Sequence, residues 1–225
     1  MLTAWPALEG EEYALAFDRG RARRVLVLPA LFDEANKLRH FAVETMRRLD
    51  AAGIDTFLPD LPGCNESRVP LDTQTLHGWR EAAEAAAEHF GATEALAIRG
   101  GALCEPAGLP VWRYAPATGA SILRAMLRAR VIASKEAGVE ETREALLERG
   151  LQDGLELAGW RLGATMIREL DAAEPGGVAL ANIAQGDLGG AGLWLRAEPD
   201  HDPAQADALA AIVAACPWRR TSRPA

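Results

Sequence analysis

The stretch 95-ALAIRGGALC-104 holds the residue whose chemistry is hardest to reconcile with its setting. Its pattern is that of a buried strand, a tight glycine turn and then a helix. In many enzymes such a corner carries a nucleophilic serine in the pattern G-x-S-x-G. The five residues that occupy the positions of this pattern here are Ala97, Ile98, Arg99, Gly100 and Gly101. An arginine stands in the central position, and it cannot attack a carbonyl carbon because its guanidinium stays protonated.

Arg99 in this position has two interpretations. Its five N–H donors beside Gly100, at a helix N-terminus whose dipole favours anions, predict a site for a carboxylate, phosphate or sulfate. Alternatively, Arg99 forms an internal ion pair with Asp33, Glu34 or Asp60, which follow neighbouring predicted strands. A ligand that displaces an internal partner would satisfy both interpretations.

A dense polar cluster follows the apolar run 23–32 and consists of Asp33, Glu34, Asn36 and Lys37. A solvated loop is the ordinary explanation for such a cluster. A loop that leaves the middle of a sheet also lines the binding edge, so Asn36 and Lys37 are candidate contacts for a ligand oxygen. Lys37 has an alternative partner in Asp60.

Composition narrows the class of protein. The 225 residues are 49% hydrophobic and 25% charged, as in ordinary globular domains. The net charge of -8 disfavours binding to nucleic acids or membrane surfaces, because both are anionic. The sequence shows no apolar run long enough for a membrane span, and we expect no signal peptide. Three unpaired cysteines and four histidines without metal-ligand spacing predict a cytoplasmic protein without a metal or cofactor.

Short apolar runs alternate with helical segments, which predicts a mostly parallel sheet covered by helices on both faces. The first run, 11–17, suits an edge strand. Strands are expected at 11–17, 23–32, 54–63, 95–98, 109–115, 176–184 and 191–198, and helices at 36–53, 73–91, 163–173 and 202–216. Thr73 or Thr75 is the expected N-cap of the second helix.

The alternation breaks between residues 118 and 163, where two helices follow one another without a strand. We expect one α/β domain over 1–225, with 118–163 as a helical cap inserted above the carboxyl edge of the sheet. Ligands bind at that edge in open α/β sheets. Arg124 and Arg128 share one face of the first cap helix, either in solvent or toward the ligand.

The segment from Val25 to Ser67 resembles the first half of α/β-hydrolase domains, in particular the hydrolases associated with bacterial exosortase and exopolysaccharide systems. Two loops carry the resemblance: one has Asp33, Glu34, Asn36, Lys37 and Arg39, and the other has Asp60, Leu61, Gly63, Cys64 and Ser67. The family's elbow commonly reads Leu-Arg-x-Gly-Ala, which "AIRGGAL" resembles. The likeness extends over most of 23–170 and is weak in the last quarter.

The resemblance implies an α/β-hydrolase fold and a hydrolase acting on esters or thioesters, atypical or inactive because the elbow serine is absent. Cys64 would lie near Lys37 and Arg39, and cationic neighbours favour a thiolate. His201 follows the last predicted strand, where a hydrolase has its base. The alternatives are a packing role for Cys64 and Cys104, and a solvated loop around His201 in which Asp202 caps a helix.

Two non-catalytic interpretations stay open. The chain is a binding module for a small anionic ligand clamped by Arg99, or it associates with a partner such as a second copy of itself. The second interpretation depends on the cap helices and the tryptophans at 79, 112, 160, 194 and 218.

Overall fold

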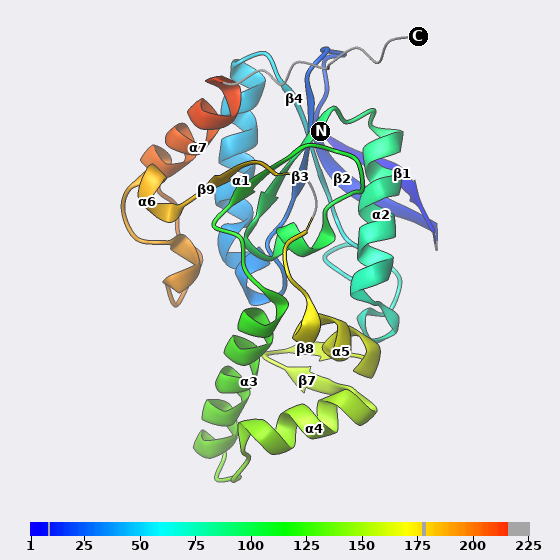
Figure 1. Cartoon of the computed structure of the whole chain (residues 1–225), viewed down its shortest axis with the longest axis vertical. Helices are drawn as coiled ribbons and strands as arrows, with labels where there is room; N and C mark the ends of the chain where they lie inside the picture. The colour runs from blue at the N-terminus through cyan, green and yellow to red at the C-terminus, as the bar shows by residue number, and fades with distance from the viewer. Residues whose placement is uncertain (9, 177–178, 216–225) are drawn as a thin grey trace.

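A computed structural model describes residues 1–8, 10–176 and 179–215. Its centre is a seven-stranded sheet with the order β1-β2-β4-β3-β5-β6-β9 (Figure 1). The strands of this sheet are β1 (Leu2–Ala7), β2 (Gly10–Phe17), β3 (Arg24–Leu28), β4 (Asp55–Pro59), β5 (Glu94–Ile98), β6 (Val111–Tyr114) and β9 (Ala179–Ile183). Strands β4, β3, β5, β6 and β9 pair in parallel, and β1 and β2 are antiparallel additions. The predicted mostly parallel sheet is confirmed.

Two strand predictions need correction. The segment 11–17 is not an edge strand, because β1 pairs outside β2. The segment 191–198 forms a 3-10 turn, η3 (Leu193–Leu195), instead of a strand. The chain leaves the sheet after residue 183, and Gly189 and Gly190 adopt positive φ just before this turn. Trp194 in the turn lies over the guanidinium of Arg99.

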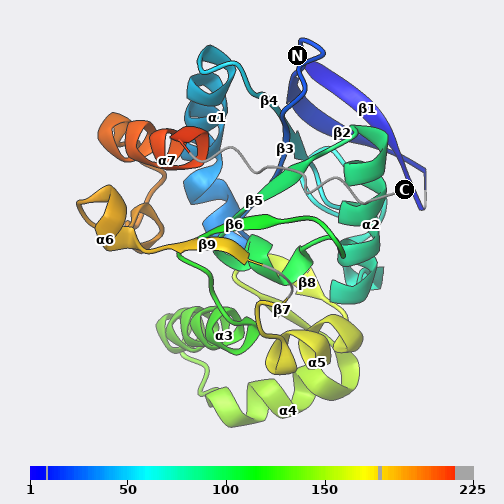
Figure 2. The same ribbon diagram turned by 45° about the horizontal axis from the view of Figure 1, so that its top comes forward.

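Helices cover both faces of the sheet (Figures 1 and 2). They are α1 (Asp33–Ala51), α2 (Leu76–His89), α3 (Gly119–Glu136), α4 (Arg143–Asp153), α5 (Ala164–Ala172), α6 (Gln185–Leu188) and α7 (Pro203–Ala215), with 3-10 turns η1 (Leu71–Thr73) and η2 (Arg99–Cys104). Of the two candidate caps for α2, Thr75 is the one used, and its hydroxyl accepts from Gly78 N at 2.9 Å.

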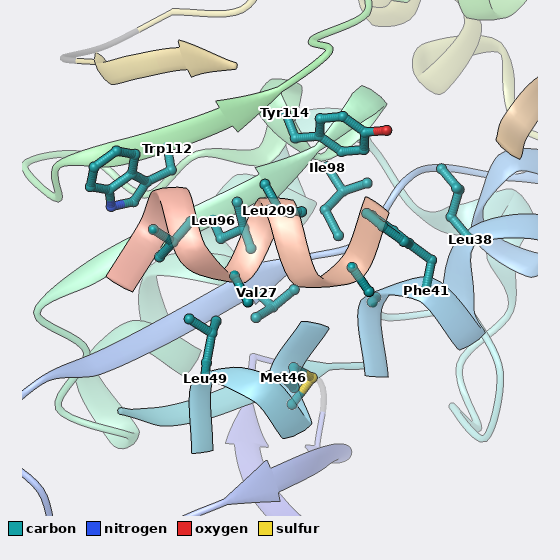
Figure 3. Close-up of a cluster of buried hydrophobic side chains, with 14 of the residues drawn as sticks. Val27, Leu38, Phe41, Met46, Leu49, Leu96, Ile98, Trp112, Tyr114 and Leu209 are labelled. Carbon is teal, nitrogen blue, oxygen red and sulfur yellow. The ribbon is translucent and has the colours of Figure 1, made fainter. Parts of the chain in front are cut away.

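Alternation along the strands divides the core into two layers. Leu96 and Ile98 of β5 face α1 and α7 (Figure 3), whereas Ala95 and Ala97 face α2. Because successive strand residues point to opposite faces, a continuous apolar run fills both layers at once. This explains why β3 and β5 contain almost no polar residue.

The segment 118–163 contains α3, α4 and a small hairpin, β7 (Leu155–Leu157) and β8 (Trp160–Leu162). The hairpin was not expected. Gly119 lets α3 approach α5 closely, since a Cβ there would lie 2.0 Å from Leu170 O. These elements gather at the end of the sheet where β3 and β5 terminate (Figure 1). We interpret them as the cap.

No helix within the described ranges has the length and apolar character needed to cross a membrane.

Candidate functional site

The corner after β5 is a strained turn. Arg99 has φ 53°, a left-handed conformation that is uncommon for a residue other than glycine. Gly101 is required behind it, because a Cβ there would lie 2.5 Å from Leu28 O. Gly100 is buried, and a Cβ on it would meet Ile122 at 2.7 Å. The backbone therefore projects the side chain of Arg99 beyond the carboxyl edge of the sheet.

The expected helix N-terminus at this corner is replaced by the short 3-10 turn η2. Such a turn has few aligned peptide dipoles, so it adds little to the affinity of the corner for an anion. The positive charge at this place belongs to the guanidinium of Arg99 itself.

Glu34 is the internal partner of Arg99. Its carboxylate accepts from Arg99 Nε at 3.0 Å and from Nη2 at 2.9 Å, a two-bond fork. Nη1 of Arg99 donates to Ala115 O at 2.8 Å. The guanidinium carbon lies 4.1 Å from the ring centre of Trp194. Of the three acidic partners that the sequence left open, the structure selects Glu34.

The polar cluster at 33–37 is not a loop. It forms the first turns of α1, where Asp33 and Glu34 interact favourably with the helix dipole. Lys37 Nζ pairs with Asp33 at 2.7 Å, one helical turn away, and not with Asp60. Asn36 is exposed and lines none of the cavities described below.

Arg99 lies in a cleft of about 430 Å³ between the start of α1 and α3. Two acids and two bases share this cleft and pair with one another, so their charges cancel. The remaining surface is mainly apolar. The lining residues are Leu31, Phe32, Asp33, Glu34, Lys37, Arg99, Ser121, Ile122, Ala125, Met126, Ala129, Ala158, Trp194 and Leu195.

Asp60 lies apart from this cleft. Its carboxylate is buried and accepts from Arg39 Nη1 at 3.1 Å and from Asn65 Nδ2 at 2.6 Å. Burial raises the pKa of Asp60, and the charge of Arg39 opposes the shift. Asp60 therefore anchors the turn after β4.

Cys64 borders a small apolar cavity of about 30 Å³ that Phe32, Trp79 and Trp160 also line. Burial, together with the charges of Asp60 and Glu12, raises the pKa of its thiol to about 12. The expected cationic activation does not arise, because Lys37 and Arg39 are engaged with Asp33 and Asp60. The surroundings of Cys64 disfavour a thiolate.

Cys104 is buried beside the same apolar cluster, and burial raises its thiol pKa to about 12. The remaining thiol, Cys216, and the tryptophan Trp218 lie outside the described residues.

His201 packs on α1. Its ring stacks on that of His40 with 4.3 Å between centres, and its Nδ1 is buried without a partner in the part of the chain described. Asp202 caps α7 by accepting from Ala204 N at 3.0 Å. Within the described residues, no hydrogen bond or ring contact joins His201 to Cys64. The proposed base and nucleophile are not brought together.

The arginines of the cap helix α3 lie at the surface of the protein and not in the Arg99 cleft. Arg124 and Arg128 are both exposed, and neither lines the Arg99 cleft. Arg130 pairs with Glu141 at 2.9 Å, so the acidic run after α3 neutralises part of the basic helix.

Sequence reasoning predicts Trp194 only as a candidate partner contact, and it misses both the position of Trp194 over Arg99 and the backbone oxygen of Ala115. Nothing in the local pattern indicates the contact with Arg99, because the run around Trp194 resembles a strand. No group of three or more His, Cys, Asp and Glu residues suited to a metal ion occurs among the described residues.

Comparison with known proteins gives a likeness in structure alone. No family model and no curated protein matches the chain. Mouse alpha/beta hydrolase domain-containing protein 10 is similar with a TM-score of 0.52 and 13% identity, over 76% of this chain and 69% of the mouse chain. Epoxide hydrolase A from Mycobacterium thermoresistibile has a TM-score of 0.42 and 15% identity, over 51% of this chain and 39% of the epoxide hydrolase chain. Proline iminopeptidase from Mycobacterium smegmatis has a TM-score of 0.43 and 16% identity, over 68% of this chain and 61% of the iminopeptidase chain.

The chain thus spans well under two thirds of the epoxide hydrolase. The assignment rests on the mouse structure together with the strand order and the flanking helices. The chain has the α/β-hydrolase fold.

Proposed function

We propose that this chain is a non-catalytic protein of α/β-hydrolase fold that binds a small carboxylate, with Arg99 as its clamp. The observation that carries the proposal is the two-bond fork between Arg99 and Glu34 inside an open cleft. A guanidinium held in the geometry for a carboxylate, at the corner where hydrolases of this fold carry their nucleophile, favours recognition over attack.

In the absence of ligand, the carboxylate of Glu34 pairs with Arg99 in the position that we propose for the ligand carboxylate. Its side chain is 21% exposed and that of Arg99 is 16% exposed, so solvent and ligand reach the pair. Glu34 lies in the first turn of α1, where its carboxylate also interacts with the helix dipole after it leaves Arg99. An incoming carboxylate exchanges one charge-assisted fork for another, which keeps the guanidinium paired throughout.

The surroundings disfavour hydrolysis. In the described part of the chain, the cleft lining includes no histidine and no cysteine. Its one hydroxyl side chain, Ser121, donates to Thr118 O at 2.8 Å. Acyl transfer needs a nucleophile and a base in hydrogen-bond reach, and the high thiol pKa of Cys64 argues against its serving as the nucleophile.

The resemblance of the loops at 33–39 and 60–67 to exosortase-associated hydrolases supports a role beside exopolysaccharide or protein-sorting systems. Within this proposal, the protein is a bacterial pseudoenzyme of the cytoplasm that senses or carries an acidic metabolite. Loss of exopolysaccharide after deletion of the chain in its host, and its return with wild type but not with Arg99→Ala, tests this role.

Direct binding tests the clamp. Isothermal titration with butanoate, benzoate, phosphate and sulfate is done on wild type, Arg99→Ala and Glu34→Gln. Arg128→Ala is the matched control, since it removes one exposed positive charge outside the cleft. We expect Glu34→Gln to bind a carboxylate more tightly than wild type, and Arg99→Ala to lose binding. Equal binding by wild type and a folded Arg99→Ala rules out the clamp.

A further inference from the structure

We propose that the ligand is a carboxylate with a linear alkyl tail, and that the tail lies along α3 away from Arg99. This inference rests on the proposed clamp and adds the shape of the ligand. The cleft volume of about 430 Å³ lies within the usual range for small-molecule sites.

The charged end of the cleft is fixed at the start of α3. Ala117 N donates to Arg99 O at 3.3 Å, one residue before the N-cap Thr118. A Cβ on Gly100 would touch Ile122 in the first turn of α3. Arg99 therefore lies beside the N-terminal turn of this helix, and the positive end of the helix dipole adds to its attraction for an anion.

The apolar end extends along the same helix. Ala125 and Ala129 line the cleft beyond Ser121, and Met126 contributes a thioether side chain. From Ser121 to Ala129 the helix rises about 12 Å at 1.5 Å per residue. The cleft is therefore elongated along α3, with Arg99 at the end beside the start of that helix.

Other elements add apolar residues to the lining. They include Leu31, Phe32, Ala158 and Leu195, and the charged groups of the lining come from Arg99 and the first turns of α1. Leu195 is 74% exposed, so its side chain offers apolar surface that an alkyl tail can cover. A cleft that is charged at one end and apolar along the rest matches an alkyl carboxylate better than it matches a compact dianion or a sugar acid.

A chain-length series tests the inference. Butanoate, hexanoate, octanoate and decanoate are titrated into wild type, Arg99→Ala, Ala129→Trp and Ala133→Trp. Both alanines are exposed on α3, but only Ala129 lines the cleft, so Ala133→Trp is the control for adding an indole to this helix. Thermal unfolding checks that each variant folds.

In wild type we expect each added methylene to tighten Kd about 2- to 4-fold until the cleft is filled. In Ala129→Trp the gain ends at a shorter chain, whereas Ala133→Trp follows wild type. Binding that needs Arg99 but does not strengthen with chain length overturns the tail and leaves the clamp intact. If Kd in Arg99→Ala is the same as in wild type and tightens with chain length in the same way, Arg99 is not the clamp, but the apolar part of the cleft still binds the alkyl tail. Tighter binding of benzoate than of octanoate also overturns the linear tail.

Discussion

The guanidinium of Arg99 lies 4.1 Å from the ring centre of Trp194, and the Trp194 ring meets Tyr114 edge-on with 6.0 Å between centres. The indole shields one face of the cation from water. A shielded cation interacts more strongly with a carboxylate in its plane, because the local dielectric constant is lower. Trp194 is therefore part of the clamp, although it comes from a turn nearly a hundred residues along the chain.

Replacing Trp194 with alanine is expected to weaken octanoate binding about 3- to 10-fold, because the cation–π contact and its shielding are lost. Trp194→Phe keeps an aromatic face and is expected to lose less. Isothermal titration gives both values. Identical Kd values for wild type and Trp194→Ala would show that the indole plays no part.

Introducing a serine at the corner is not expected to create a hydrolase. Arg99→Ser places a hydroxyl at the strained turn, but His201 is stacked on His40 and does not line the cleft. A serine without a base is a weak nucleophile. Hydrolysis of p-nitrophenyl acetate by Arg99→Ser should equal that by Arg99→Ala. A rate well above both buffer and Arg99→Ala means that a base reaches the corner after all.

The thiols of Cys64 and Cys104 are expected to resist a disulfide reagent in the native state. Burial raises both pKa values to about 12, so almost no thiolate exists near pH 8. The Cys216→Ser variant removes the third thiol from the assay. Native protein should react slowly, and urea should release two reactive thiols. Fast native labelling of Cys64 would revive it as a candidate nucleophile.

Glu141 is expected to make the turn after α3 sensitive to acid. Hydrogen bonds from Ser134, Arg130 and Arg149 lower its pKa to about 2. A carboxyl whose folded pKa is lowered stabilises the fold above its ordinary pKa, and that stability is lost as the pH falls toward the folded value.

Urea unfolding of wild type, Glu141→Gln and Glu140→Gln between about pH 2 and 6 measures this effect. The difference between wild type and Glu141→Gln should shrink as the pH falls, and Glu140→Gln, which changes an exposed neighbour, should track wild type. A difference that does not vary with pH contradicts the assignment.

Local patterns were sufficient where burial dictates residue type. The apolar runs of β3 and β5, the periodic faces of α1 and α2, and the glycines at 100 and 101 follow from packing needs that act over a few residues. The same patterns failed at 191–198, because an apolar run reads alike as a buried strand and as a turn packed on the core. They also missed β1, whose alternation is interrupted by Pro6.

By itself the sequence determined that a parallel α/β sheet would carry Arg99 at a corner on its binding edge, since strand pattern and glycine turn are local properties. Only the tertiary structure decided which acid pairs with Arg99, that Trp194 covers it, and that Cys64 and His201 have separate surroundings. These outcomes depend on the relative placement of α1, α3 and the turn at 193–195. Such long-range packing is a cooperative property of the whole chain, and no short segment encodes it.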